Sequence, residues 1–274
     1  MTFSIVARQG SAHGIDVASK FLAVGAVVPA ARLGVGAVAT QSFARVAYLE
    51  ELLGRLAGGQ PVATALDEAV ALDEGRETRQ IGVVGVDGAA TFTGGECNDW
   101  AGGVAADEGD TAFAIQGNIL VGPQVVQAME QAWRDSAGRP FAQRLLAALV
   151  AGDDAGGDSR GRQSAALYAV EPDAGYDDCG VLADLRVDDH TDPVGELGRL
   201  LGEWEMFFGK PEGVEPLTGQ LGDEVRERLA RLGFEGDDVA TSLADWAGHA
   251  NYESRLSDDG IDARVLTALR DATA

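Results

Sequence analysis

The sequence TFSIVARQGSAHGIDVASK, which occupies residues 2–20, predicts a β-hairpin at the start of the chain. Thr2–Arg8 and Ile15–Lys20 are rich in strand-forming residues, and Gln9–Gly14 between them has the glycine-containing composition of a turn. We therefore expect two antiparallel strands, with residue 2 at the open end of the hairpin.

The segments that follow the hairpin predict an α+β fold. Strand patterns recur at Leu33–Ser42, Gln80–Val86, Ala89–Gly94, Thr111–Gln116, Gln163–Val170 and Val181–Val187. Helical patterns, with apolar residues three and four positions apart, recur at Val46–Leu56, Pro61–Val70, Val125–Trp133, Phe141–Val150 and Pro193–Phe207. Strands, a helical block and strands again predict two sheets with helices stacked on their outer faces.

A change of composition predicts a second, smaller domain. Residues 208–217 contain two glycines and two prolines, as a linker does, and residues 218–274 carry helical apolar patterns. We expect a layered domain at 1–207, a linker at 208–217 and a compact helical module at 218–274.

The charge of the chain excludes some partners. The 274 residues carry a formal net charge of −23, which opposes binding to the phosphates of nucleic acid. Lys20 and Lys210 are the only lysines, and this acidic, lysine-poor composition is typical of proteins from a high-salt cytosol, although a GC-rich genome is an alternative origin. No apolar stretch is long enough to span a membrane and no secretory signal is visible, so we expect a cytoplasmic protein.

Neither a metal nor a cofactor is predicted. Cys97 and Cys179 lack metal-ligand spacing, the histidines are three in all, and no glycine-rich nucleotide-binding motif joins a strand to a helix. In the acidic segment Asp188–Asp192 a metal site is conceivable, but its place just before Pro193 favours helix capping by Asp192.

Thr2 is a candidate nucleophile. A small second residue allows an aminopeptidase to remove Met1, which would leave a threonine with both a hydroxyl and a free α-amino group. These are the nucleophile and the base of N-terminal-nucleophile hydrolases, and an α-amino group with a pKa of about 7.7–8.0 is partly deprotonated near neutrality. The residues alone leave open that Met1-Thr2 is a chance dipeptide.

Long motifs in the first 205 residues resemble a single family, the domain of unknown function 1028, which also carries a fimbrial-assembly label. The matching runs are MTFSIVAR (1–8), VASKFLAVGAVVP (17–29), GVGAVATQ (34–41), RQIGVV (79–84), Thr93-Gly94 with Cys97 and Trp100–Gly102, GNIL (117–120), Gly156–Asp158, QSAA (163–166) and DLRVDDH (184–190). The resemblance implies a four-layer αββα sandwich like that of N-terminal-nucleophile hydrolases. The chain departs from the family at Gln9, where an acidic residue is usual.

Four further residues are candidates for roles beside Thr2. Asn118 can donate to the oxyanion that forms on an amide carbonyl, or can cap a turn. Lys20 can lower the pKa of the α-amino group, or can be a solvated strand end. Asp158 and Arg160 can orient that amino group or bind an anionic substrate, or can pair to hold their glycine-rich loop. Ser164 is the alternative nucleophile.

The sequence therefore leaves two alternative functions open. The first is a cytosolic amidohydrolase that acts on a small amide or N-acyl substrate, and the second is a catalytically silent binder of a small molecule or protein. A homo-oligomer is left open. The tail, with Asp223–Phe234 and Ile261–Leu266, resembles a peptidoglycan-binding helical module, which we interpret as a structural or pocket-covering appendage or as a ligand binder.

Overall fold

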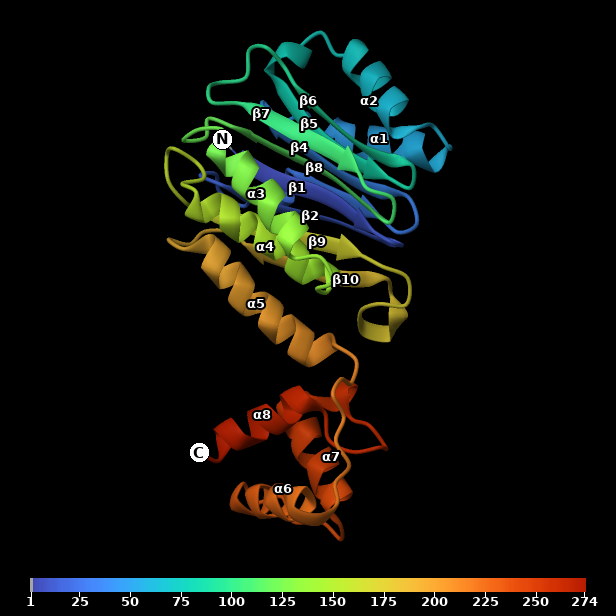
Figure 1. Cartoon of the computed structure of the whole chain (residues 1–274), viewed down its shortest axis with the longest axis vertical. Helices are drawn as coiled ribbons and strands as arrows, with labels where there is room; N and C mark the ends of the chain where they lie inside the picture. Colours follow the sequence, from blue (N-terminus) through green and yellow to red (C-terminus); the bar gives the residue numbers. More distant parts are fainter. Residues whose placement is uncertain (1) are drawn as a thin grey trace. The chain divides into compact units, whose positions relative to one another are not determined.

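The computed structural model describes residues 2–274 and divides the chain after Leu201 into two compact units. The first unit contains two antiparallel sheets (Figure 1). The larger sheet has the order β10 (Val181–Val187), β9 (Ser164–Val170), β2 (Ala12–Ser19), β1 (Thr2–Gln9), β8 (Thr111–Asn118) and β7 (Gly102–Asp107). The smaller sheet has the order β3 (Pro29–Arg32), β4 (Gly36–Ser42), β5 (Arg79–Gly85) and β6 (Gly88–Thr93).

Helices cover the outer faces of both sheets, which gives the predicted αββα sandwich. On the larger sheet lie α3 (Gln124–Asp135) and α4 (Phe141–Asp154), and on the smaller sheet lie α1 (Ala47–Ala57) and α2 (Val62–Ala71) (Figure 1). Short 3-10 helices occupy Val24–Ala26, Arg76–Thr78, Tyr176–Asp178 and Glu253–Arg255. The inner faces of the sheets contact each other through β6 against β7, β5 against β8 and β1 against β4.

The predicted hairpin is confirmed, with a shorter turn than expected. Phe3 pairs with Ala18, and the strands are joined through Gly10 and Ser11, where Gly10 has a φ of 57°. Of the remaining predicted turn residues, Gln9 belongs to β1, whereas Ala12, His13 and Gly14 belong to β2. A Cβ at Gly14 would come within 2.9 Å of the Leu145 side chain of α4. A glycine here therefore serves close packing of a helix on the sheet.

Two strands were not predicted. β3 is only four residues long, and β7 consists mostly of glycine and alanine, which have low strand propensity. Both are edge strands, where pairing with one neighbour decides the conformation. The predicted strand Leu33–Ser42 is also shorter than expected, because residues 33–35 form the turn between β3 and β4.

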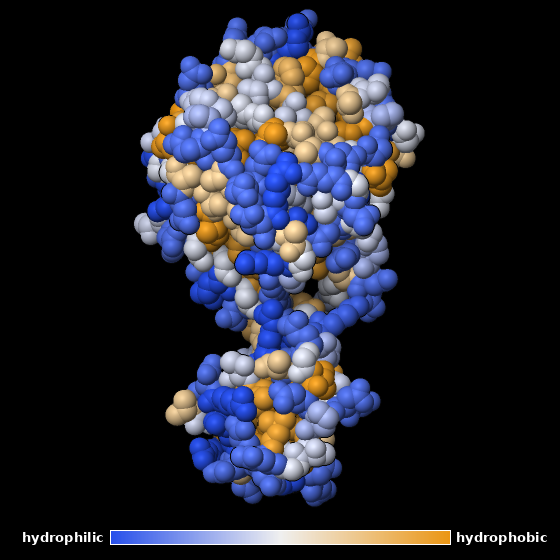
Figure 2. All heavy atoms as spheres, viewed as in Figure 1, coloured by the Kyte–Doolittle hydropathy of each residue, from blue (hydrophilic) through white to orange (hydrophobic). Residues whose placement is uncertain are grey.

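Apolar side chains fill the layers of the first unit. Between the sheets lie Val6, Ile15, Val17, Ala37, Ala39, Val84, Ala112 and Ala114. On the face in view in Figure 2, hydrophilic side chains predominate, with small apolar areas among them. The middle of the space between the sheets is therefore apolar, whereas polar side chains lie between the sheets at the end where β1 begins.

The second unit is a small helical domain. α5 (Pro193–Phe208) crosses the division of the chain, and α6 (Gly219–Arg231), α7 (Val239–Ala250) and α8 (Ala263–Ala272) surround an apolar cluster that includes Trp246. A buried ion pair joins Arg255 Nη1 to Asp262 Oδ2 at 2.8 Å, and Asp262 also caps α8. Of the helices in residues 2–274, none has the length and apolar character to cross a bilayer.

Candidate functional site

Thr2 begins the strand at the centre of the larger sheet, between β2 and β8. It is 6% exposed, and its Oγ1 lies 3.1 Å from Oγ of Ser19, the last residue of β2. Met1, whose removal the nucleophile requires, lies outside the described residues. The two hydroxyls therefore form a buried pair at the end of the hairpin, and the sequence analysis anticipated one of them.

Asn118 lies directly opposite Thr2 on the other flanking strand. The two residues are paired in the ladder between β1 and β8, and Asn118 is 1% exposed. Its Nδ2 donates to Oε1 of Gln80 at 2.9 Å, whereas its Oδ1 has no hydrogen-bond partner among the described residues. The side chain thus bonds across to the second sheet rather than capping the turn that follows β8.

Gln80, which the sequence analysis did not single out, holds Asn118. Gln80 Nε2 donates to the carbonyl oxygen of Gly117 at 2.8 Å, to that of Gly102 at 3.3 Å and to Oγ1 of Thr93 at 3.0 Å. With its nitrogen bound to three acceptors, Gln80 presents Oε1 to Asn118. The side chain is fully buried and links β5 to the end of β8.

Further buried polar side chains continue this network between the sheets. Gln41 Nε2 donates to Gln80 Oε1 at 2.8 Å and to the carbonyl oxygen of Thr2 at 3.3 Å. Ser4 Oγ donates to Gln41 Oε1 and accepts from Gln116 Nε2, each at 2.7 Å. The network therefore holds the backbone carbonyl of Thr2 and the side chain of Ser4, two residues further along β1.

A sequence signal for this network exists. Gln41 lies two and four positions after Ala39 and Ala37, and Gln116 lies two and four positions after Ala114 and Ala112. Because side chains alternate along a strand, each glutamine shares the face of its buried alanines. A glutamine in phase with apolar residues indicates an interior polar group.

The glycine-rich loop at residues 155–162 passes beside the start of β1. Asp158 forms an isolated bridge with Leu120 after β8, and its Oδ2 accepts from the backbone N–H of Lys20 after β2 at 2.7 Å. Asp158 Oδ1 accepts from the backbone N–H of Arg160 at 2.8 Å, and Arg160 Nη2 lies 3.5 Å from Oδ2. These contacts match the interpretation in which Asp158 and Arg160 hold the loop.

The side chain of Lys20 is exposed and also contacts this loop. Its Nζ donates to the carbonyl oxygen of Arg162 at 3.2 Å. The structure thus brings Thr2, Ser19 and Asn118 together at the end of the sandwich. Asp158 and Arg160 lie on the adjoining glycine-rich loop, and Lys20 contacts that loop.

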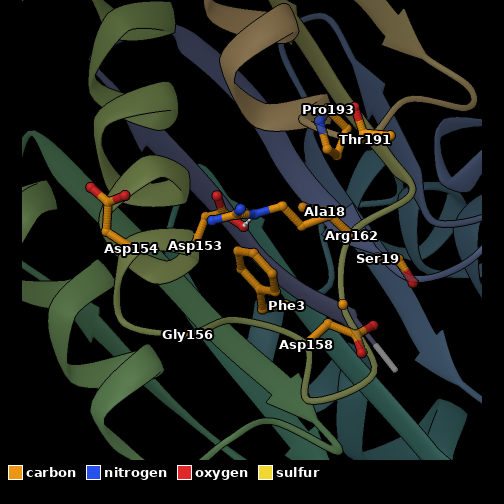
Figure 3. A pocket seen from close by; sticks show the side chains of 11 residues that line it. Phe3, Ala18, Ser19, Asp153, Asp154, Gly156, Asp158, Arg162, Thr191 and Pro193 are labelled. Atoms are coloured by element: carbon orange, nitrogen blue, oxygen red, sulfur yellow. Dashed lines mark hydrogen bonds and ion pairs between the residues drawn. The ribbon is translucent and has the colours of Figure 1, made fainter.

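A cavity of about 450 Å³ lies beside these residues (Figure 3). Its lining residues are Phe3, Ala18, Ser19, Asp153, Asp154, Gly156, Asp158, Gly161, Arg162, Thr191 and Pro193. In Figure 3, Phe3 lies centrally, with the Asp153–Arg162 ion pair above it and Ser19 and Asp158 to one side. The cavity has the volume of a small-molecule site. Ser19, which lines it, also forms the hydrogen bond with the Thr2 hydroxyl.

Other candidates from the sequence are engaged elsewhere. Ser164 Oγ donates to the carbonyl oxygen of Phe21 and accepts from the backbone N–H of Val24 at 3.1 Å, so it holds the segment after β2. Asp192 Oδ1 accepts from the backbone N–H of Gly195 at 3.4 Å, as expected for a residue that caps α5. Its capping role is therefore confirmed.

Two titratable groups on β2 are buried away from this cluster. Burial lowers the pKa of His13 to about 4, despite the hydrogen bond between Nδ1 and the carbonyl oxygen of Ser11. Burial raises the pKa of Asp16 well above its usual value, against the opposing effect of the Val17 N–H donated to Oδ1. Each group is thereby favoured in its neutral form.

Comparison with known proteins gives two family matches. Residues 2–197 match the model described as "Family of unknown function (DUF1028)", and residues 207–269 match the model described as "Putative peptidoglycan binding domain". The fold is similar to the crystal structure of a DUF1028 protein from Silicibacter pomeroyi, with 31% identity and a TM-score of 0.66. That match covers 81% of this chain and 92% of the other. A search of the curated proteins found none that matches.

Proposed function

We propose a function for this chain, which belongs to the family of unknown function DUF1028, on the basis of the cluster around Thr2. In this proposal the protein is a cytoplasmic amidohydrolase, and Thr2, made N-terminal by removal of Met1, attacks a small amide or N-acyl substrate. The observation that carries the proposal is the buried Thr2 hydroxyl, 3.1 Å from Ser19 and directly opposite Asn118, beside a cavity of about 450 Å³.

The proposed reaction uses groups that converge on residue 2. The α-amino group takes the proton of Thr2 Oγ1 as this oxygen attacks the carbonyl carbon, and the resulting ammonium then protonates the departing amine. Water hydrolyses the ester that remains on Thr2. Asn118 Nδ2 has two N–H groups, of which one serves Gln80, so the other can donate to the oxyanion.

The loop residues have supporting roles in this proposal. The ammonium of Lys20, held against the loop by the Arg162 carbonyl oxygen, favours the neutral form of the α-amino group. Asp158 and Arg160 shape the loop beside the substrate and carry charge near the amino end of β1. The −23 charge of the chain keeps nucleic acid out of consideration as a partner.

A binder without catalysis is the second candidate. The cavity favours it, because Thr2 is not among the lining residues while Ser19 is. For the second unit we propose ligand binding at a cavity of about 570 Å³ whose walls include Leu217, Leu243 and Leu256. Peptidoglycan fragments are the first ligands to test there, in view of the family match.

Mass spectrometry and a matched pair of variants test the catalytic proposal. We expect intact mass to show loss of Met1, and processed protein to turn over a substrate in a panel of small amides, cyclic imides and N-acyl amino acids. Thr2→Ala, which preserves a removable Met1 and a free amine, should abolish turnover, whereas Thr2→Ser should retain part of it. Asn118→Ala should lower kcat by roughly 10²–10³.

The controls separate the two candidates. Ser164→Ala should leave the chemistry intact, since Ser164 Oγ is bonded to the segment after β2. Turnover by Thr2→Ala would assign the chemistry to another nucleophile. A ligand bound equally by wild type and Thr2→Ala, with hydrolysis by neither, would favour the binder.

A further inference from the structure

We propose that Oδ1 of Asn118 accepts a hydrogen bond from the α-amino group that Thr2 acquires on removal of Met1, and so positions the base of the reaction. This inference rests on the proposed function only in requiring that Met1 is removed. It assigns to Asn118 a second role, carried by its oxygen, beside the proposed donation from its nitrogen.

The orientation of the Asn118 amide follows from its neighbours. Gln80 lies 2.8 Å and 3.3 Å from the carbonyl oxygens of Gly117 and Gly102, which can only accept, so the Gln80 atom facing them is Nε2. Gln80 Oε1 must then face Asn118. An Asn118 oxygen at 2.9 Å from that atom would place two acceptors together, so the Asn118 atom there is Nδ2.

The remaining oxygen of Asn118 is a buried acceptor. Asn118 is 1% exposed, and Oδ1 has no hydrogen-bond partner among residues 2–274. Buried carbonyl oxygens are nearly always satisfied, because burial removes the water that would otherwise donate to them. A donor supplied by processing or by a ligand would satisfy this oxygen.

The α-amino group of Thr2 is a donor on the residue that pairs with Asn118. Thr2 and Asn118 are ladder partners, so the amino end of β1 begins beside the end of β8. Hydrolysis of the Met1–Thr2 peptide bond converts one N–H into an amino group with two or three, and the added hydrogens can turn toward Asn118. The Thr2 hydroxyl lies 3.1 Å from Ser19 Oγ, which gives it a hydrogen-bond partner other than Asn118.

The charged groups near this end are on the glycine-rich loop and on Lys20, which follows β2. Asp158 already accepts from the backbone N–H groups of Lys20 and Arg160, whose side chains are exposed cations. From the smaller sheet the uncharged Gln41 and Gln80 reach the same end. Asn118 therefore adds an uncharged acceptor whose Oδ1 has no other partner among the described residues. A hydrogen bond to this oxygen modestly favours the ammonium form of the Thr2 α-amino group and directs the nitrogen of that group toward Thr2 Oγ1.

A titration of the α-amino group tests the inference without reference to turnover. Processed protein labelled with ¹³C-threonine would report the pKa through the Thr2 Cα shift. Asn118→Ala should lower this pKa by about one unit, since an acceptor stabilises the ammonium more than the amine. Ser164→Ala is the matched control: it removes a buried hydroxyl that is bonded to the segment after β2, and it should leave the pKa within about 0.2 units.

Further outcomes keep the inference open to contradiction. An unchanged pKa in Asn118→Ala would overturn it. If Asn118→Ala does not fold, Asn118→Asp takes its place, and a carboxylate in contact with the amine should raise the pKa by more than about one unit. No rise in that variant would also overturn it. Retention of Met1 removes both this inference and the proposed nucleophile, whereas a shifted pKa without hydrolysis supports this inference alone.

Discussion

The space between the two sheets differs between its middle and the end where β1 begins. In the middle, Val6, Ile15 and Val84 pack by shape and volume. At the end where β1 begins, Gln41 and Gln80 form hydrogen bonds with each other and with backbone carbonyl oxygens of β1 and β8. Apolar contacts tolerate substitutions of similar volume, whereas removal of one partner from a buried hydrogen-bond network costs the desolvation free energy of the groups left behind. The polar end is therefore the part of the interior that specifies atomic orientation, and the candidate site lies there.

The largest difference should appear when each region loses one side chain of β5. Gln80→Leu removes the hydrogen-bond partner of two backbone carbonyl oxygens and of the side-chain amides of Asn118 and Gln41. This loss should lower the unfolding free energy by about 4–6 kcal/mol. Val84→Ala, in the apolar middle, should cost about 2 kcal/mol. Denaturant unfolding of the full chain measures both. Equal losses would show that the polar end is not special.

Protonation of His13 is the next largest effect. The ring is 1% exposed on β2, and burial lowers its pKa to about 4 from an ordinary 6.5. Because the folded-state pKa is the lower one, the stability linked to His13 is fully present above pH 6.5 and is lost as the pH falls toward 4. The loss should reach about 3 kcal/mol.

Unfolding of wild type and His13→Gln at pH 7.5 and pH 4 measures that loss. The variant should lack it, so the stability difference between the two proteins should change over this window. Carboxylates that titrate in the same range are common to both proteins and cancel in the difference. A difference independent of pH would show that the ring is not held neutral by burial.

The last effect should come from Asp16, with the opposite dependence on pH. Burial raises its pKa, so the stability linked to its proton is present at acid pH and is lost as the pH rises through the folded-state pKa. Asp16→Asn carries no such proton, so its unfolding free energy relative to wild type should be higher at pH 8 than at pH 4. Chemical denaturation at both pH values measures this difference. A constant offset would contradict a raised pKa.

The order and type of the main elements could be predicted from the sequence. The hairpin of β1 and β2, the strand pair β5 and β6 and helix α5 after Asp192 were all expected, because alternation, turn residues and caps are local signals. β3 and β7 were missed because their residues have little strand propensity of their own. Pairing at the sheet edges, a property of the assembled sheet, decides them.

The candidate site could be predicted only in part. Thr2 is predicted from its position after Met1 and Asn118 from its amide at a strand end, and the two residues lie opposite each other in the ladder. Ser19, Gln41 and Gln80 were not chosen, because a polar residue near a strand end usually faces solvent. Their roles depend on a second sheet that covers them.

By itself, therefore, the sequence determined the layered α+β architecture and the place of Thr2 at the start of the first strand, because periodicity and turn chemistry act over a few residues. The tertiary structure alone decided which atom of Asn118 is left without a partner. That orientation is imposed by Gln80, 38 residues away in the chain, whose own amide is held by the carbonyl oxygens of two other strands. A hydrogen bond has a direction, and only the assembled sheets supply the donors and acceptors that set it.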